Sequence, residues 1–250
     1  MESDATAFAA SGEPSVRTVV WLHGNRIESS EAFGIGTTVY HSLTRQLPTD
    51  RPIRFVIWSW PSERVGGAIE DARVKAARTN PNAHYLAQFV AQMDPSTPIT
   101  LIGYSFGARV ITGSLHLLGG GSVSGEPLAI TLPQRTLGIR AVLIAPAIDN
   151  DWLLPGHRHG LALSQVESML LMINSCDKVL KRYHLLYCGA RKRNGPQALG
   201  YTELVGGGRL GEDRLKIEQT DACCAAGPEH YWRNYFNSPS LVVRMEPYVE

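Results

Sequence analysis

The sequence predicts an α/β fold in which a mostly parallel, doubly wound sheet is covered by helices on both faces. Short apolar runs rich in β-branched residues alternate along the chain with longer segments of helical periodicity. The chain has 250 residues, and an α/β fold of this length commonly stays one domain. We therefore expect a polar leader over residues 1–16 and a single domain over residues 17–250.

The strands are expected at apolar runs that end in polar or glycine-containing loops. These runs are residues 17–22, 53–58, the segment from Ile99 to the glycine of residue 103, and residues 139–145, 169–174 and 215–219. Helical spacing is found at residues 37–47, and at residues 68–93 with a break at Asn80-Pro81 that predicts two helical pieces. The glycine-rich segment 119–125 predicts a flexible connection without a regular element.

Charge and cysteine content narrow the class of function. Lys and Arg number 24 against 23 Asp and Glu, which argues against a nucleic-acid surface and favours small, neutral or weakly charged substrates. No segment approaches the length of a membrane span, and residues 1–16 lack the pattern of an export signal. We expect a soluble, cytoplasmic protein without stable membrane insertion; the sequence does not predict its oligomeric state.

The four cysteines, Cys176, Cys188, Cys223 and Cys224, show no Cys-x-x-Cys spacing and no nearby histidine pair at zinc-ligand intervals. They are expected to be free thiols. The vicinal pair 223–224 is expected to be buried as small hydrophobic residues after the last strand, with a redox element as the alternative. No metal and no cofactor is predicted.

The most informative stretch joins a strand to a helix through Gly103-Tyr104-Ser105-Phe106-Gly107. A Gly-x-Ser-x-Gly turn in this position is typical of a nucleophile elbow, in which a tight, strained turn projects a serine hydroxyl. A side chain at Gly103 or Gly107 is expected to collide with the neighbouring strand or helix. The backbone N–H of Phe106, at the start of the helix, is free to bind an anion.

A second anion donor is expected where the first strand runs into His23-Gly24. The glycine lets this loop turn back, so that the backbone N–H of Asn25 can complete an oxyanion hole with Phe106. His23 itself is expected to orient the loop rather than to act as a base. His23, Tyr104 and Trp60 are candidate substrate-binding residues, although packing beside a strand end is an equal interpretation for the tryptophan.

A serine nucleophile needs a base and a carboxylate, which in this architecture follow in the order Ser, Asp or Glu, His. His230, after the last strand, is the predicted base, because His184 is too close along the chain to the predicted acid. Asp177 is the predicted acid, with Asp149 as the alternative and a helix cap as its other possible role. His157 and His159 are expected in an exposed loop.

These residues resemble the α/β-hydrolase superfamily, and more specifically a bacterial group of α/β-hydrolase domains of unknown function. The resemblance covers most of residues 17–235 and is carried by the elbow and by four further motifs: His23-Gly24, Trp60-Pro61-Ser62, Asp71, and residues 177–180 with residues 229–231. Tyr104 and Phe106 depart from the His and Met expected in that group, and residues 189–206 form an insertion. The resemblance implies the fold and serine hydrolase chemistry, but no substrate.

The expected function is hydrolysis of carboxylic esters of small or medium acyl chains by Ser105, Asp177 and His230 through an acyl-enzyme. Acyl transfer and thioester or amide hydrolysis would use the same residues. The alternatives are a non-catalytic binding module that kept the fold, and a membrane-surface lipase, for which no clear apolar lid helix is found between Ser105 and His230.

Overall fold

The computed structural model describes residues 4–45, 52–130, 138–186 and 195–250. Its centre is a sheet of six strands in the order β2-β1-β3-β6-β7-β8, and every pairing is parallel. The strands are β1 (Arg17–Leu22), β2 (Ile53–Trp58), β3 (Ile99–Tyr104), β6 (Ile139–Ile144), β7 (Val166–Ile173) and β8 (Ile217–Asp221). The predicted parallel, doubly wound sheet is confirmed.

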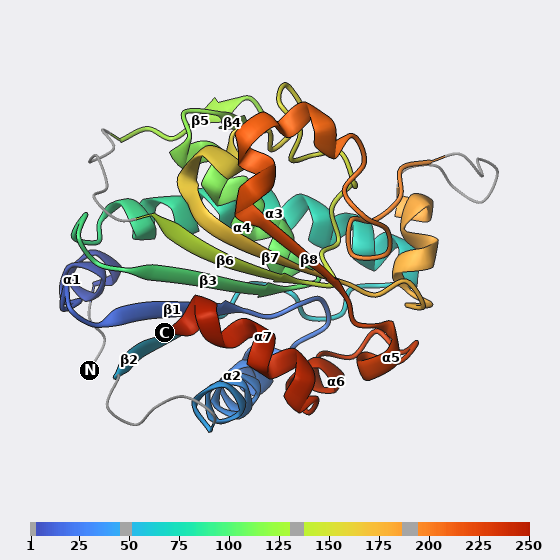
Figure 1. Ribbon diagram of the computed structural model, residues 1–250, viewed down its shortest axis with the longest axis horizontal. Coiled ribbons are helices and arrows are strands. Elements are labelled where there is room, and N and C mark those ends of the chain that lie inside the picture. Colours follow the sequence, from blue (N-terminus) through green and yellow to red (C-terminus); the bar gives the residue numbers. More distant parts are fainter. Residues whose placement is uncertain (1–3, 46–51, 131–137, 187–194) are drawn as a thin grey trace.

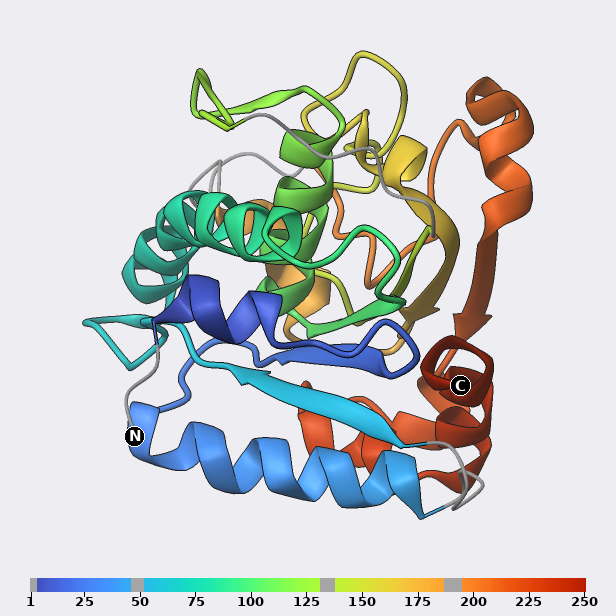
Figure 2. The same ribbon diagram turned by 90° about the vertical axis from the view of Figure 1, so that its left-hand side faces the viewer.

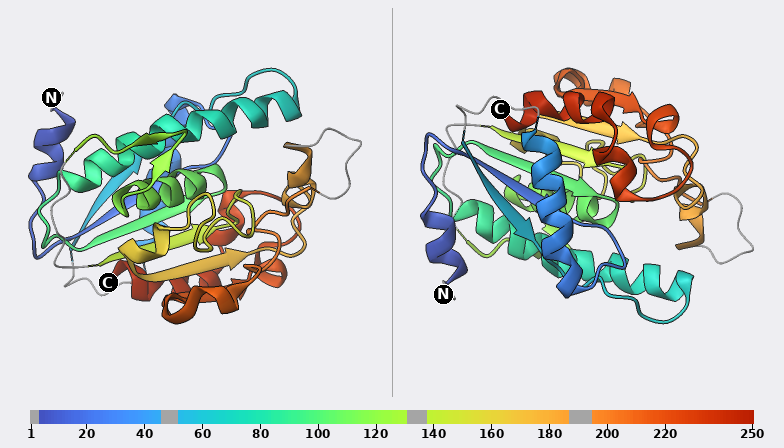
Figure 3. Two further views of the ribbon diagram at one scale, coloured as in Figure 1. Left: turned by 90° about the horizontal axis from the view of Figure 1, so that it is seen from above. Right: turned by 90° about the horizontal axis from the view of Figure 1, so that it is seen from below.

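Helices cover both faces of this sheet (Figure 1). On one face lie α3 (Ala68–Ala91) and α4 (Phe106–Leu118), and on the other α2 (Ser29–Thr44), α6 (Trp232–Phe236) and α7 (Pro239–Val249), as the two views in Figure 3 show in turn. Shorter elements complete the described chain. They are α1 (Ala5–Ala10), the hairpin β4 (Ser122–Val123) and β5 (Glu126–Pro127), η1 (Ala162–Gln165), η2 (Leu180–Leu186), η3 (Gly207–Lys216) and α5 (Cys223–Ala226).

The alternation of side chains along β1 explains why the sheet is covered twice. Val20 and Leu22 pack into the core under α3 and α4, while Val19 and Trp21 pack into the core under α2, α6 and α7. Successive residues of a strand point to opposite faces, so a strand that is apolar at every position needs a helical layer on each side. Trp21 meets Phe236 of α6 edge to face at 5.2 Å between ring centroids.

Two local expectations were wrong. Helix α3 is continuous through Pro81; on either side of the proline, the Oγ1 of Thr79 donates to the carbonyl of Ala76 and the Nδ2 of Asn82 donates to the carbonyl of Arg78. The segment 119–125 is not devoid of regular structure, because β4 lies within it and pairs with β5. The hairpin turns at Ser124 and Gly125, both with positive φ.

Helix α2 begins at Ser29, earlier than the periodicity indicates, with a capping box between Glu28 and Glu31. Its expected end at Leu47 lies outside the described residues. Figure 2 shows α2 running alongside β2 at the edge of the sheet. The segment before Arg17 contains α1, whose Phe8 ring stacks on Phe89 of α3 at 6.3 Å. No helix within the described ranges is both long and apolar enough to cross a membrane.

The strand order reverses at β1. The chain passes from β1 to β2 on one side and then returns to place β3 on the other side. In open parallel sheets, reactive groups gather beyond the carboxyl ends of the strands at such a switch point. Here that position is shared by the loops after β1 and β3.

Candidate active site

Ser105 sits at the sharp turn between β3 and α4. Its backbone has φ 55° and ψ −116°, in a region that non-glycine residues rarely occupy. Such a conformation costs on the order of 1–3 kcal/mol and persists only where the surroundings enforce it. They do so here, because the Ser105 N–H donates to the carbonyl of Ile144 at 2.9 Å and the Ser105 carbonyl accepts from the N–H of Ala147 at 3.2 Å.

The two glycines of the elbow allow this close packing. A Cβ at Gly103 would lie 2.6 Å from the backbone nitrogen of Ala108, and one at Gly107 would lie 2.4 Å from the carbonyl oxygen of Leu22. Both contacts are with backbone atoms, which cannot move aside as a flexible side chain can. The predicted collisions at both positions are confirmed.

Ser105, His230 and Asp177 lie in one hydrogen-bonded sequence. The Oγ of Ser105 is 2.9 Å from Nε2 of His230, and Nδ1 of His230 is 2.6 Å from Oδ2 of Asp177. Three distant parts of the chain supply these groups: the elbow after β3, the loop after β7 and the loop after β8. The Asp177 side chain is fully buried, the imidazole is 13% exposed and Ser105 is 5% exposed. An aligned hydroxyl, imidazole and carboxylate is the arrangement by which a serine is activated as a nucleophile.

The carboxylate of Asp177 has two separate sets of partners. Its Oδ1 accepts from the backbone N–H groups of Val179 and Leu180 at 2.8 and 2.9 Å, so it caps the turn that leads into η2. Its Oδ2 is left for His230. The two roles weighed for this aspartate are therefore compatible. Asp149, the alternative acid, accepts instead from the hydroxyl of Tyr183 at 2.7 Å.

The imidazole of His230 is held from the side by Tyr104. The two rings stack at 5.0 Å between centroids with an interplanar angle of 28°. Tyr104 is buried, and that burial raises the pKa of its hydroxyl well above the usual value, so the ring stays neutral. His230 lies in the loop ahead of α6, which begins at Trp232.

The loop after β1 lies against the elbow. We call residues 23–27 the β1 loop. A Cβ at Gly24 would lie 3.2 Å from the Cβ of Ser105 and 2.8 Å from the ring of Tyr104, so glycine permits the close approach. Among the described residues, no protein acceptor binds the backbone N–H of Asn25 or that of Phe106. Two free backbone donors, on the loops after β1 and β3, are what an oxyanion hole requires.

Trp60 packs against the first residue of the β1 loop, His23. The indole Nε1 of Trp60 donates to the carbonyl of His23 at 2.8 Å, and the backbone N–H of Trp60 donates to Nε2 of His23 at 3.3 Å. The two rings stack on each other. Burial lowers the pKa of His23, which keeps the imidazole neutral and able to accept that bond. His23, Trp60 and Tyr104 are all buried. That they bind substrate stays a prediction, while their contacts with one another and with the elbow are structural.

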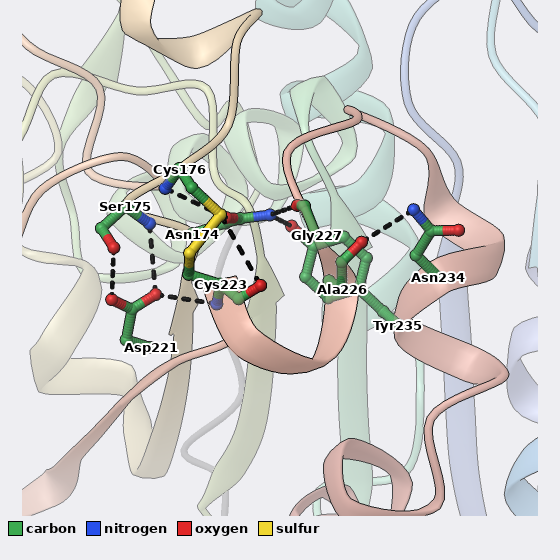
Figure 4. The surroundings of a disulfide bond; sticks show 9 residues. All are labelled: Asn174, Ser175, Cys176, Asp221, Cys223, Ala226, Gly227, Asn234 and Tyr235. Atoms are coloured by element: carbon green, nitrogen blue, oxygen red, sulfur yellow. Dashed lines mark hydrogen bonds between the residues drawn. A yellow bond between two sulfur atoms is a disulfide. The ribbon is translucent and has the colours of Figure 1, made fainter.

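The loops after β7 and β8, residues 174–179 and 222–231, are joined covalently. We call them the β7 loop and the β8 loop. A disulfide connects Cys176 to Cys223, so the expectation of free thiols was wrong for this pair. The expected burial of residues 223–224 was wrong too, because Cys223 is half-buried and Cys224 is free and exposed; Cys188 lies outside the described residues. Figure 4 shows the bond with Asp221 beside it, whose carboxylate accepts from Ser175 and from the N–H of Cys223. The two cysteines follow adjacent parallel strands, a proximity that spacing rules for metal sites and redox motifs do not detect.

Hydrogen bonds add to this connection. The Nδ2 of Asn174 donates to the carbonyl of Gly227 at 2.9 Å and to the hydroxyl of Tyr235 at 3.0 Å, and the N–H of Lys178 donates to the carbonyl of Pro228 at 3.0 Å. Disulfides are characteristic of proteins in oxidising compartments. The Cys176–Cys223 disulfide weighs against the expected cytoplasmic location, which stays a prediction.

His159 does not lie in an exposed loop as expected. It is 2% exposed, its Nδ1 is 2.9 Å from Oγ1 of Thr112, and its ring meets Trp152 edge to face. Burial, together with the positive charges of Arg109 and Arg158, holds the pKa of His159 well below its usual range. His157 pairs with Asp151 at 3.2 Å. In the part of the chain that the structure describes, no group of three or more His, Cys, Asp or Glu side chains is arranged to hold a metal ion.

Comparison with known proteins finds similarity of shape. No family model matches the chain, and no curated protein matches it by sequence. Among solved structures, acyl-protein thioesterase 2 from Zea mays is 14% identical, with 96% of this chain and 94% of that chain covered and a TM-score of 0.48. Carboxyl esterase 2 from Tuber melanosporum is 12% identical, with 95% and 78% covered and a TM-score of 0.46. A carboxylesterase from Mesorhizobium loti is 11% identical, with 93% and 88% covered and a TM-score of 0.39.

The chain has the α/β-hydrolase fold. This assignment rests on the parallel strand order and on the serine elbow between β3 and α4. Similarity at the level found among solved structures does not transfer an activity. The resemblance to a particular bacterial group of such domains stays a prediction.

Proposed function

We propose that this chain is a serine hydrolase that cleaves carboxylic esters of small or medium acyl chains through an acyl-enzyme. The observation that carries the proposal is the hydrogen-bonded sequence from Ser105 through His230 to Asp177, at 2.9 and 2.6 Å. Both distances lie in the range required for proton transfer and for orientation of the base.

In this proposal His230 takes the hydroxyl proton of Ser105 through Nε2 as Oγ attacks the acyl carbonyl carbon. Asp177 accepts from the Nδ1–H, which holds the tautomer with Nε2 unprotonated and stabilises the imidazolium that forms. The imidazolium then gives its proton to the leaving alkoxide. In the second half-reaction His230 takes a proton from water, hydroxide adds to the acyl carbon, and the acid leaves with the Ser105 hydroxyl restored.

The backbone N–H groups of Asn25 and Phe106 are the proposed oxyanion donors. The N–H of Phe106 belongs to the first turn of α4, where helix geometry leaves it without an intrahelical acceptor and the helix dipole favours negative charge. Donors already aimed at the developing charge need no reorganisation during the reaction, and removing one typically costs ~100- to 1000-fold in kcat.

Esters are the proposed class because the serine, imidazole and carboxylate suit acyl transfer from an ester, and because the near balance of charged residues favours uncharged substrates. Thioesters, amides and acyl acceptors other than water use the same residues. A series of p-nitrophenyl esters from acetate to laurate, beside an acyl thioester and an acyl anilide, distinguishes them. The proposal expects the highest kcat/KM with esters of short or medium chain.

The deciding experiment combines covalent labelling with one substitution. A fluorophosphonate is expected to modify Ser105, identified by peptide mass mapping, and Ser105→Ala is expected to abolish labelling and to lower kcat on p-nitrophenyl butyrate by about a millionfold. Ser114→Ala is the matched control, because Ser114 is a buried serine of the same helix whose hydroxyl bonds only the carbonyl of Ile111 among the described contacts. Labelling elsewhere, or turnover by Ser105→Ala at the wild-type rate, would refute the proposal.

A further inference from the structure

Asp71 of α3 is a buried carboxylate that the proposed mechanism does not use. Its side chain has no exposed surface, yet it accepts four hydrogen bonds. Two come from the β1 loop, from Nδ2 of Asn25 at 2.8 Å and Nε of Arg26 at 2.9 Å. The others come from the N–H of Val65 at 2.8 Å and from Nζ of Lys75, itself fully buried, at 3.2 Å.

The partners of this carboxylate explain its charge state. Burial alone would raise the pKa of Asp71, but the hydrogen bonds from Val65, Arg26, Asn25 and Lys75 outweigh that effect and lower the pKa to about 2. The group is thus ionised at neutral pH. An ionised acceptor with four donors forms short, directional bonds, which define the position of each donor closely.

The part of the β1 loop that Asp71 holds is the part that the proposed reaction needs. The backbone N–H of Asn25 is a proposed oxyanion donor, the side chain of Asn25 is bound to Asp71, and Arg26 follows with φ 59°. A left-handed arginine is strained, so the turn requires external support. Ser62 gives part of it, since its carbonyl accepts from the Arg26 N–H at 2.8 Å and its Oγ bonds both the N–H and the carbonyl of Ile27.

We propose that Asp71 is the positioning residue of the oxyanion hole: it binds the side chains of Asn25 and Arg26 and thereby aims the Asn25 N–H at the reacting carbonyl. This inference rests on the proposed function. It assigns a role to a carboxylate that touches neither Ser105 nor His230 in the described contacts. A displacement of about 1 Å at such a donor costs roughly a hundredfold in rate.

The test uses Asp71→Asn and Asn25→Ala, with kcat expressed per active site titrated with a fluorophosphonate. Asp71→Asn loses the charge that holds both loop side chains, and kcat on p-nitrophenyl butyrate is expected to fall roughly a hundredfold with KM changed less than about threefold. Asn25→Ala keeps the backbone N–H but loses the hydrogen bond from Nδ2 to Asp71, and kcat is expected to fall about tenfold. Inhibition by a trifluoromethyl ketone, which forms a tetrahedral oxyanion on serine, is expected to weaken by the same factors.

A double-mutant cycle separates positioning from a purely structural role. In Asp71→Asn/Asn25→Ala the combined loss of kcat is expected to be close to that of Asp71→Asn alone, because both changes break one interaction. Asp94→Asn is the matched control: Asp94 caps a turn at Ser96, before the amino end of β3 and thus at the opposite edge of the sheet, and kcat is expected to stay at the wild-type value. A structural role would lower the melting temperature but leave kcat per titrated site, and inhibitor affinity, unchanged.

The outcomes distinguish this inference from the function on which it rests. If the wild-type protein turns over esters and Asp71→Asn matches its kcat, the positioning role is overturned and the proposed function stands. If Asp71→Asn does not fold, Asn25→Ala decides, and wild-type kcat in that variant overturns the role. If the wild-type protein neither reacts at Ser105 nor hydrolyses any ester, the proposed function is refuted and the positioning role with it.

Discussion

The two sides of the candidate site are supported by different chemistry. On one side, the β1 loop with the proposed oxyanion donor Asn25 is held by hydrogen bonds to a buried carboxylate, Asp71, and to Ser62. On the other side, the β7 and β8 loops, which carry Asp177 and His230, are joined by the Cys176–Cys223 disulfide. Ser105 lies between them, and its turn is held by the close packing at Gly103 and Gly107 and by backbone hydrogen bonds to residues 144 and 147.

This difference implies that the two sides of the site respond to different perturbations. A carboxylate with charged partners loses its effect when it is protonated, and a disulfide loses its effect when it is reduced. Acid should therefore weaken the hydrogen bonds by which Asp71 holds the β1 loop, and a thiol reductant should remove the covalent link between the β7 and β8 loops and lower the melting temperature. Each perturbation can be applied to the intact protein, and a substitution on the matching side should remove the response.

The largest effect is expected within the acid–base side itself. In Asp177→Asn, the amide oxygen can still cap Val179 and Leu180, but its NH₂ faces Nδ1 of His230 and favours the wrong tautomer. We expect kcat to fall about 10⁴-fold with little change in melting temperature. Steady-state kinetics per titrated active site measures it.

Asp149→Asn is the control for that substitution, since Asp149 was the other candidate acid and bonds Tyr183 instead of His230. Its kcat is expected to stay close to the wild-type value. A fall in kcat of about 10⁴-fold in Asp149→Asn would assign the role of the acid to Asp149, and wild-type turnover in Asp177→Asn would exclude Asp177 from that role.

The second effect concerns the disulfide and stability. The bond closes a sequence separation of 47 residues, and the loss of such a crosslink costs up to about 4 kcal/mol through the entropy of the unfolded chain. Cys176→Ser/Cys223→Ser is expected to melt about 10 °C below the wild-type protein, measured by calorimetry. Turnover at 25 °C should be retained, because Asn174 and the Lys178 N–H still bind the β8 loop.

Two controls test whether that loss comes from the bond. Dithiothreitol is expected to lower the melting temperature of the wild-type protein and to leave that of the double variant unchanged, while Cys224→Ser, which changes the free and exposed cysteine, behaves as the wild-type protein. An unchanged melting temperature after complete reduction, verified by alkylation and mass mapping, would contradict the expectation.

The regular core was predictable because its signals are local. The runs 17–22 and 53–58 have the bounds of β1 and β2, since apolar and β-branched residues dominate each run and each contains only one charged residue. The elbow was predictable for a related reason. Glycine is required at residues 103 and 107, where the backbone packs against other backbone atoms, and this requirement produces the fixed spacing of Gly-x-Ser-x-Gly in the sequence. The chain order of Ser105, Asp177 and His230 follows from the architecture.

What escaped prediction depends on contacts between distant residues. Pro81 indicates a break, but α3 continues through it and is buried on both sides of the proline, at Thr79, Asn82, Ala83 and Leu86 among others. Cys176 and Cys223 become neighbours only when β7 and β8 pair. Asp71 was noted as a motif residue without a role, since the donors that surround it come from residues 25, 26 and 65 as well as from its own helix. Tertiary packing decides such features, and no window of sequence contains it.

The smallest expected effect is the acid response of the oxyanion side. The pKa of Asp71 is about 2 in the folded protein, below the usual 3.8 of an unfolded chain, so its stabilisation is complete above pH about 5 and is lost as the pH falls toward 2. The shift corresponds to about 2 kcal/mol of unfolding free energy. Urea unfolding of the wild-type protein and of Asp71→Asn between pH 6 and 2 measures this contribution as the part of the pH dependence of stability that the variant lacks.

Asp221, beside the disulfide, is the comparison. Burial raises the pKa of Asp221, but hydrogen bonds from Ser175 and Cys223 outweigh that effect and lower the pKa, and both of these partners are neutral. Asp221→Asn should therefore remove a smaller part of the acid response than Asp71→Asn, and the reverse order would contradict the contrast between the two sides.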